Sequence, residues 1–345
     1  MRNKCFSFAI GIGSLNNKDE WLDAFYPRPL LNPSTALLKT ITSIIQYNGG
    51  NVVIKLDSAT CHALEESFEN SNENQLAEDM KILEVSSQPR LITILENDYP
   101  PSSTPEAYLK LHLLSHRLIK PHQVNLEGIF SLLPNVAWTS DGAIDPEELA
   151  TRQLKARAEG RFLSVNSVDK FPKMTDYVVP SGVRIAHTAR VRLGAYVGEG
   201  TTIMHEGFIN FNAGTEGINM IEGRISSGVI VGEGSDLGGG CSTMGTLSGG
   251  NNIVISVGKN CLIGANAGVG IPLGDRCTIE AGLYLTAGSK VQLLNEKRQP
   301  TKTATAVELS GKPDLLFRRN SLTGSVECLA NKSSVVLNEE LHAHN

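Results

Sequence analysis

The residue types best suited to chemistry stand two positions apart, at Glu222 and Arg224 in the stretch MIEGRIS (220–226). A carboxylate can take a proton from an attacking nucleophile, and a guanidinium can bind a substrate carboxylate through two parallel hydrogen bonds. Gly223 between them permits close approach of another part of the backbone. The plain alternatives are a solvated carboxylate at Glu222 and an ion pair of Arg224 with Glu222 or Asp236.

A second candidate is the run Arg318-Arg319-Asn320-Ser321, which brings two guanidinium groups and two polar donors together. Such a cluster suits phosphate groups, although paired arginines are also commonly solvated.

Two histidines, His187 and His205, are 18 residues apart. One full turn of an 18-residue coil would place their side chains on one face. A metal-dependent hydratase would normally need three protein ligands, and the glycine-rich half of the chain has only these two histidines.

That half of the chain repeats every six residues, and 23 of the 33 glycines lie between Val183 and Val291. A six-residue period fits neither a helix nor an amphipathic strand, and it is typical of a parallel β-helix with three strands per coil. Each repeat should send one aliphatic side chain inward. The repeat positions are Ile185, Val191, Val197, Ile203, Ile209, Ile225, Val231, Leu237, Val257, Ile263, Val269, Leu273, Ile279, Leu285 and Val291.

The period breaks at 210–224, at 244–256 and between Val269 and Leu273. We expect extruded loops there, and function commonly lies on such loops. Cys261 and Cys277 each stand two residues before a repeat position, so we expect buried thiols.

The sequence before residue 180 alternates helix and strand signals instead. Asn51–Leu56 and Leu91–Leu95 read as strands, and the residues after Cys5 read as a first strand rather than a signal peptide. Helices are expected over 37–45, 59–68, 75–83, 107–118, 124–133 and 146–158. The domains predicted are an α/β domain (1–120), a helical connector (121–180), a β-helix (181–300) and a C-terminal extension (301–345).

Composition excludes several classes. Hydrophobic residues make up 41% and charged residues 19%, which is globular, and a net charge of −5 argues against a nucleic-acid partner. No apolar run is long enough to cross a membrane. The six scattered cysteines indicate reduced thiols in the cytoplasm.

The repeats and their interruptions together resemble a known family. The stretches are MHEGFINFNAGT (204–215), MIEGRIS (220–226), GSDLGGGCSTMGTLSGG (234–250), CLIGANAGVGIPLGD (261–275), EAGLYLTAG (280–288) and LLFRRNS (315–321). They resemble the tetrahydrodipicolinate N-succinyltransferases of the longer bacterial type, within the left-handed β-helix acyltransferases.

This resemblance implies transfer of a succinyl group from succinyl-CoA to the amino group of ring-opened tetrahydrodipicolinate (L-2-amino-6-oxopimelate), a small amino dicarboxylate, in the diaminopimelate route to lysine. It also implies a homotrimer with active sites between adjacent β-helices.

The resemblance further assigns residues. Glu222 matches the catalytic glutamate, acting either as a general base, which we favour, or through an acyl anhydride. Arg224 matches the contact to the succinyl carboxylate. The remaining matched contacts to succinyl-CoA are Gly239, Ser242, Ala265, Glu280, Ala281 and Gly288, with Arg318, Arg319, Asn320 and Ser321 at its phosphates. Glu206 matches a divalent-ion (Mg²⁺) ligand near the trimer axis, whose partner acid is Ala189 here.

Other readings stay open. The chain could be a related transferase that uses acetyl-CoA, with His205 as base, or a β-helix that binds without catalysis. The acceptor-binding residues are undetermined, although Asn210, Asn212 and Ser248 are polar and lie in the interruptions.

Overall fold

The computed structural model describes residues 5–247 and 253–330. The chain divides into two compact units: Met1–Leu113 with Val124–Pro172, and Leu114–Gln123 with Lys173–Asn345. This division differs from the predicted boundaries at residues 120, 180 and 300. Most of the predicted connector belongs to the first unit, whereas residues 114–123, the last seven of the predicted α/β domain and the first three of the connector, belong to the second.

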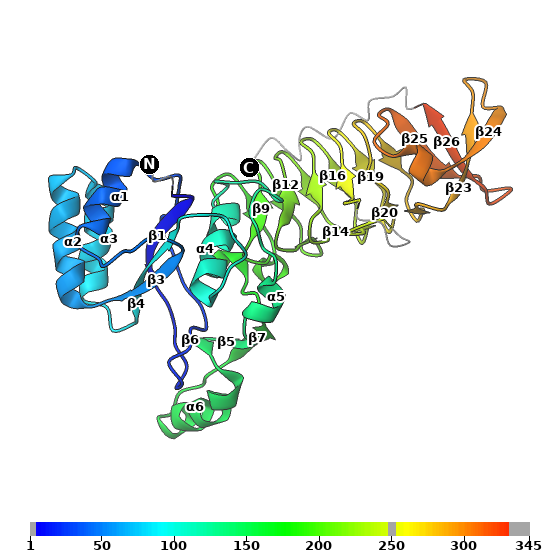
Figure 1. Cartoon of the computed structure of the whole chain (residues 1–345). Helices are drawn as coiled ribbons and strands as arrows, with labels where there is room; N and C mark the ends of the chain where they lie inside the picture. The colour runs from blue at the N-terminus through cyan, green and yellow to red at the C-terminus, as the bar shows by residue number, and fades with distance from the viewer. Residues whose placement is uncertain (1–4, 248–252, 331–345) are drawn as a thin grey trace. The chain divides into compact units, whose positions relative to one another are not determined.

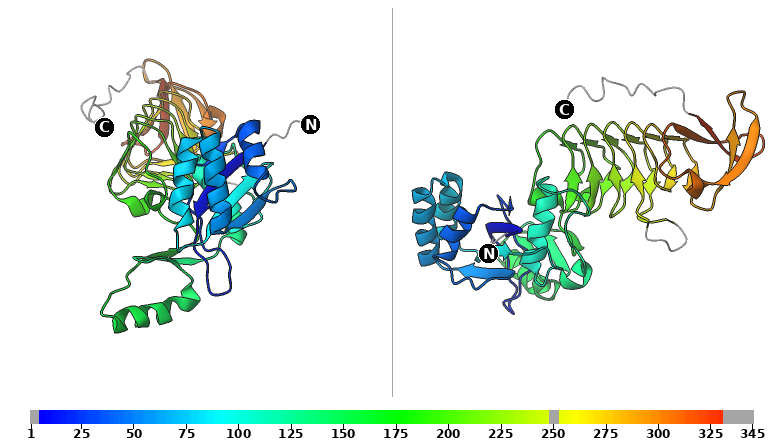
Figure 2. Two further views of the ribbon diagram at one scale, coloured as in Figure 1. Left: turned by 90° about the vertical axis from the view of Figure 1, so that its left-hand side faces the viewer. Right: turned by 45° about the horizontal axis from the view of Figure 1, so that its top comes forward.

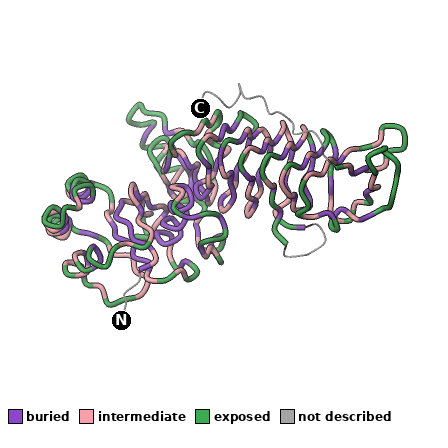
Figure 3. The backbone as a smooth tube through the Cα atoms, turned by 90° about the horizontal axis from the view of Figure 1, so that it is seen from above, coloured by how far each residue is buried: buried purple, intermediate pink, exposed green. Residues whose placement is uncertain are grey.

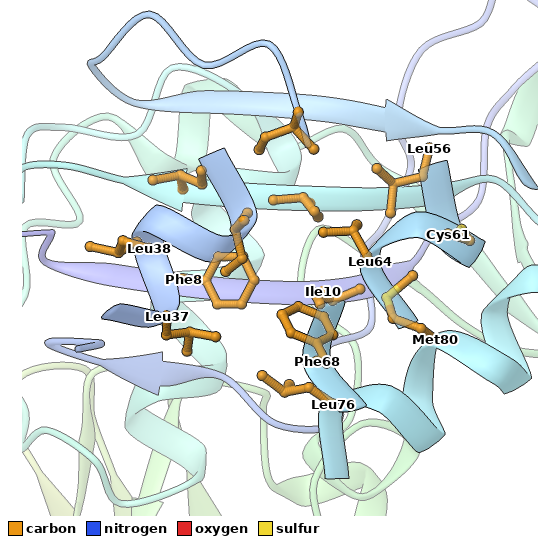
Figure 4. Packing of buried hydrophobic residues seen from close by; sticks show 14 of the residues in the cluster. Phe8, Ile10, Leu37, Leu38, Leu56, Cys61, Leu64, Phe68, Leu76 and Met80 are labelled. Atoms are coloured by element: carbon orange, nitrogen blue, oxygen red, sulfur yellow. The ribbon is translucent and has the colours of Figure 1, made fainter. Parts of the chain in front are cut away.

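The first unit is built on an antiparallel sheet of order β2-β1-β4-β3, which includes the expected first strand as β1. Helices α1, α2 and α3 bury their apolar faces against it, and Figure 4 shows Phe8 and Ile10 of β1 packed against Leu64 and Phe68 of α2. The elements are β1 (Ser7–Ile12), β2 (Leu30–Leu31), α1 (Thr35–Thr42), β3 (Val52–Leu56), α2 (Ser58–Asn70), α3 (Asn74–Glu84) and β4 (Arg90–Leu95).

Side-chain caps and left-handed residues set the ends of several helices. The Ser34 side chain accepts the amide of Leu37 at the start of α1, which satisfies a donor that the helix cannot. Helix α4 (Thr104–Ser115) corresponds to the helix expected over 107–118. It begins three residues earlier, and it ends before residue 118 because Arg117 adopts a left-handed conformation (φ 61°).

The predicted connector is not purely helical. Helix α6 (Pro146–Ala158) is as expected, but residues 124–133 contain only the short α5 (Ile129–Leu132). The Asn125 side chain accepts the amide of Glu127 in a local turn that competes with a helix, and Gly128 has a φ of 76°. The segment also forms a three-stranded sheet of order β6-β5-β7, from β5 (Val136–Thr139), β6 (Gly142–Ile144) and β7 (Val165–Asp169).

The second unit is a parallel β-helix, as the six-residue period predicted. Figure 1 shows its short strands stacked as rungs, and Figure 2 shows the successive coils from a second direction. The first face contains β8 (Arg184–Ile185), β10 (Thr202–Ile203), β13 (Met220–Ile221), β16 (Asp236–Leu237), β19 (Leu262–Ile263) and β21 (Thr278–Ile279). The second contains β11 (Phe208–Ile209), β14 (Arg224–Ile225), β17 (Ser242–Thr243), β20 (Gly268–Gly270) and β22 (Tyr284–Thr286). The third contains β9 (Ala195–Val197), β12 (Ala213–Thr215), β15 (Ile230–Val231) and β18 (Ser256–Val257).

The predicted repeat positions form the core of these coils. All of them are buried except Ile185, which is half-buried in the first coil. Buried and more exposed residues alternate along the coils in Figure 3. Cys261 and Cys277 are buried free thiols, as expected.

Two of the three breaks in the period are short corners rather than extruded loops. Residues 210–224 continue the coil through β12 and β13, and the period breaks because Ile221 on the first face is followed by Ile225 on the second. Other coils take six residues for this step, as from Ile203 to Ile209. The step from Val269 to Leu273 is shortened in the same way, and both residues are buried.

The break at 244–256 includes residues 248–252, which lie outside the described residues. Thr246 and Val254, within this break, form an isolated antiparallel bridge.

The β-helix ends in two hairpins, β23–β24 and β25–β26. Strand β25 adds to the first face beside β21, placing Phe317 opposite Ile279 and closing the core. The bounds are β23 (Lys290–Leu294), β24 (Pro300–Thr305), β25 (Leu315–Arg319) and β26 (Val326–Ala330).

Within the described residues, no helix has the length and apolar character needed to span a membrane.

Candidate active site

Glu222 lies on the shortened corner between the first and second faces. Its amide donates to Leu237 O (2.8 Å) in the next coil, and its carbonyl accepts from Gly240 N (3.3 Å). The corner therefore belongs to the regular hydrogen-bonded ladder, which holds the Glu222 backbone rigidly. The side chain is half-buried.

The shortened corner depends on Gly223. A Cβ atom there would stand 2.3 Å from Cys241 Sγ and 2.7 Å from Cys241 O, so only glycine allows the two coils to approach. Burial raises the pKa of the Cys241 thiol to about 12. Cys241 is therefore a neutral packing group beneath the corner and not a nucleophile.

The corners that follow Glu222 carry little side-chain bulk. A Cβ atom at Gly239 would stand 3.4 Å from Glu222 Oε2, so the carboxylate extends over the glycine turn of the next coil. The amide of Glu222 donates to the next coil. In the three coils that follow, the residues whose amides make the equivalent hydrogen bond are Gly238, Gly264 and Glu280. Glu222 and Glu280 therefore lie at the two ends of a strip along this corner. The two positions between them, Gly238 and Gly264, have no side chains.

Arg224 points outward from the second face and is exposed. In the strand register it lies opposite Phe208 on one side and Ser242 on the other. Among the described residues no ion pair joins Arg224 to Glu222, and Asp236 accepts the amide of Met220 (3.1 Å). The guanidinium is available to a ligand beside the predicted contact Ser242.

Tyr284 continues the same outward row and was not singled out from the sequence. Its ring would lie 2.4–2.5 Å from a Cβ atom at Gly268, so a residue with a side chain at position 268 would clash with the ring. Gly268 pairs with Ser242 on one side and Tyr284 on the other. The only sequence signal was a tyrosine at a repeat position usually occupied by a small or polar residue.

Of the other predicted contacts to the acyl donor, three lie on the same edge of the β-helix, whereas Gly288 follows β22 at the far end of the second face. Ala265, Glu280 and Ala281 are exposed at successive corners between the first and second faces, and Gly288, farther on, has open space around it. A ligand could run along this edge past backbone groups.

The arginine run is more structured than a solvated pair. Arg318 Nε and Nη2 donate to Glu327 Oε2 (3.0 and 2.8 Å), and Asn320 Nδ2 donates to Glu327 Oε1 (2.7 Å). Arg319 is exposed, and its amide donates to Glu280 Oε2 (2.7 Å). Ser321 is exposed in the turn that follows. Glu327 was missed, although a carboxylate in the apolar strand sequence VECLA was a usable signal.

The two histidines do share one face, as predicted: the rings of His187 and His205 meet edge to face with centroids 5.1 Å apart. His205 Nδ1 lies 3.2 Å from Glu206 Oε1, and both side chains are exposed. Among the described residues the one close group of three metal-ligating side chains is His62, Glu65 and Glu84. A magnesium ion prefers several oxygen ligands, which Glu206 of a single chain does not supply.

The acceptor candidates differ. The Asn210 side chain accepts from Arg192 Nη1 and Phe211 N. Asn212 has a φ of 51° and accepts the amide of His122, so it shapes the backbone. Ser248 lies outside the described residues.

The open turn at Gly239 gives a first prediction. Gly239→Val should crowd the Glu222 carboxylate and lower kcat about tenfold or more, with little loss of thermal stability, because the added atoms meet a side chain and not backbone. Gly223→Ala is the matched control: it should lower Tm, because its Cβ meets Cys241 O. Steady-state kinetics and thermal denaturation of both variants test this, and a fully active Gly239→Val would contradict it.

The fold and this site define a hexapeptide-repeat acyltransferase of the left-handed β-helix class. Residues 254–287 match the family model described as the hexapeptide repeat of succinyl-transferase, and residues 133–173 match the one described as tetrahydrodipicolinate N-succinyltransferase middle. The chain belongs to the tetrahydrodipicolinate N-succinyltransferase family.

Relatives along the full length support this membership. The 2,3,4,5-tetrahydropyridine-2,6-dicarboxylate N-succinyltransferases of Pseudomonas putida and Pseudomonas paraeruginosa are 63% and 62% identical over 345 residues, covering 100% of this chain and of each relative. That of Vibrio cholerae is 55% identical and covers 98% of this chain and 99% of its own. A crystal structure of a putative 2,3,4,5-tetrahydropyridine-2-carboxylate N-succinyltransferase from Campylobacter jejuni is 33% identical, with a TM-score of 0.88 over 96% of this chain and 93% of that one.

Proposed function

We propose that this chain transfers the succinyl group of succinyl-CoA to the amino group of ring-opened tetrahydrodipicolinate, giving N-succinyl-2-amino-6-oxopimelate and CoA in the diaminopimelate route to lysine. The observation that carries the proposal is the position of Glu222, on a shortened corner beside the open turn at Gly239, in a chain that matches N-succinyltransferases along its full length.

The reaction uses Glu222 as a general base. The acceptor nitrogen attacks the thioester carbonyl, Glu222 takes the proton that the nitrogen loses, and the tetrahedral intermediate collapses with loss of the CoA thiolate. The new C–N bond replaces the C–S bond, and the proton ends on the leaving thiolate. A thioester is already activated, so no acyl-Glu222 intermediate is needed.

The acyl donor is proposed to lie along the strip that follows Glu222. Gly239, Ala265, Ala281 and Gly288 would offer backbone groups and little bulk to the pantetheine arm. Ser242, whose amide donates to Ala267 O (2.9 Å), would offer its hydroxyl. Glu280 and the run 318–321 would lie at its phosphate end.

Arg224 is proposed to bind the carboxylate of the succinyl group. Arg224→Ala should raise KM for succinyl-CoA about tenfold or more, since a charge-assisted hydrogen bond is lost. Transfer from acetyl-CoA, which has no such carboxylate, should be unaffected or relatively favoured. Kinetics with both donors check this; an equal loss with both would mean that Arg224 has a structural role.

The proposed activity is tested by measuring CoA release with tetrahydrodipicolinate as acceptor. Succinyl-CoA should be turned over much faster than acetyl-CoA. The converse result would favour an acetyltransferase with His205 as base, and no release from either donor would favour a binding module.

We also propose a homotrimer, with each site completed between adjacent β-helices, and a cytoplasmic location, which the six unpaired cysteines suit. Mg²⁺ at Glu206 would need oxygen ligands beyond this single chain, so we route no step through a metal.

A further inference from the structure

The strands at the end of the β-helix contain a buried carboxylate that the reaction does not use. Glu327 on β26 lies directly opposite Arg318 on β25 and is 4% exposed. Both of its oxygens accept hydrogen bonds, Oε2 from Arg318 and Oε1 from Asn320. These hydrogen bonds lower the pKa of Glu327, so it is ionised throughout the neutral range.

Arg318 and Arg319 differ in the charge of their partners, because Arg318 forms an ion pair with Glu327 and Arg319 does not. Arg318 Nε and Nη2 are both directed at Glu327, so its charge is balanced within the protein. The Arg319 guanidinium instead donates Nη1 to a neutral group, Gly324 O (2.9 Å). That bond holds Arg319 in place without cancelling its charge. Of the pair, Arg319 is therefore the better partner for an anion.

The turn that orients Arg319 depends on the same carboxylate. Asn320, held by Glu327, accepts the amides of Leu322 and Thr323 through Oδ1 (2.9 and 3.1 Å). Its backbone pairs with Ser325 O and Gly324 N (2.8 Å each), which closes the turn and places Gly324 O beside Arg319. From the other side, Glu280 accepts the Arg319 amide.

We propose that Glu327 is a positioning residue for coenzyme A, which holds Arg318 and Asn320 in place and thereby presents Arg319 to the phosphate groups of the cosubstrate. This rests on the proposed function, because it takes succinyl-CoA as the ligand of this end of the β-helix. Arg318 serves as scaffold in this arrangement and Arg319 as contact.

The test is Glu327→Gln in the full-length chain, assayed with succinyl-CoA and with S-succinyl-pantetheine, which lacks the phosphates. KM for succinyl-CoA should rise about tenfold, with kcat changed less than about twofold because the group is remote from the reacting atoms. KM for S-succinyl-pantetheine should not change, and Glu327→Asp should restore part of the loss. A merely structural role would change kinetics with both donors together.

The matched control is Asp314→Asn, which breaks the exposed Arg276–Asp314 ion pair (2.6 and 2.8 Å) in the same unit. It should leave both KM values unchanged. An unchanged succinyl-CoA KM in a folded Glu327→Gln would overturn the proposal. If Glu327→Gln does not fold, Arg319→Met removes the proposed phosphate contact directly. An unchanged KM for succinyl-CoA in Arg319→Met would also overturn the proposal.

Calorimetric titration with CoA alone separates this proposal from the proposed function. Wild-type protein that binds CoA, with weaker binding by Glu327→Gln, supports the positioning role even where no succinyl transfer is found. Wild-type protein that transfers succinyl groups, with CoA binding unaffected by Glu327→Gln, refutes the positioning role alone.

Discussion

Replacing Glu222 by glutamine should lower kcat for succinyl transfer by about 10³-fold, within the range that positioned general bases contribute. Glutamine keeps the size of the side chain and loses only the ability to accept the proton. Because the Glu222 backbone is held by the coil ladder, Tm should remain that of the wild type, and KM for succinyl-CoA should change little. Stopped-assay kinetics and thermal denaturation measure these effects.

Glu233→Gln serves as the control, since Glu233 is an exposed carboxylate of the same β-helix whose partner, Lys259, lies 3.4 Å away. It should retain full activity. Rapid-quench mass spectrometry without acceptor decides between the two roles of Glu222: a succinylated Glu222 would contradict general-base catalysis and favour the anhydride.

Replacing Lys110 by methionine should destabilise the first unit strongly. The Lys110 ammonium is completely buried and donates to Asp98 Oδ1 (2.6 Å), Tyr99 O (2.5 Å) and Asn125 O (2.8 Å). Desolvation lowers the pKa of Lys110, and Asp98 opposes this shift. Methionine fills the space but removes the ammonium that donates to Asp98 and to two carbonyls, and leaves Asp98 with the Asn125 amide (2.9 Å). This change costs about 3–5 kcal/mol of unfolding free energy.

Chemical denaturation of Lys110→Met and of Lys18→Met provides the comparison. Lys18 forms an ion pair with Glu147 (2.8 Å) between exposed side chains, so its loss should leave the midpoint unchanged. Equal, small effects of the two substitutions would show that the Lys110 cluster contributes little.

The β-helix was predictable because its inward positions obey a strict count. Every coil must send one side chain into a narrow core, so the aliphatic repeat is visible at Val231 or Ile263 without any structure. The six-residue spacing gives a wrong prediction where one step between faces is only four residues long. Ile221 is followed by Ile225 on the next face, which a linear search cannot distinguish from an inserted loop.

The local helix predictions failed where side chains compete with the backbone. Asn125 and Gly128 replaced the start of the expected helix at 124–133 by a turn. The strands at 136–169 were missed because they are short and belong to a small sheet.

For the candidate site, the sequence predicts a set of residues but not their arrangement in space. Glu222 and Arg224 stood out by residue type, whereas the open turn at Gly239 depends on how successive coils stack. Glu327 contacts Arg318 and Asn320 across a hairpin, and Tyr284 covers Gly268 of the preceding coil; both contacts depend on strand pairing, which residue type alone does not reveal.

The most direct test is a crystal structure of the protein with CoA and a non-reactive 2-aminopimelate acceptor. The account predicts the acceptor nitrogen within hydrogen-bond reach of Glu222, about 2.6–3.2 Å from the carboxylate, with the CoA sulfur above Gly239. A nitrogen bound outside hydrogen-bond reach of Glu222, or CoA bound away from the corners that follow it, would contradict the account.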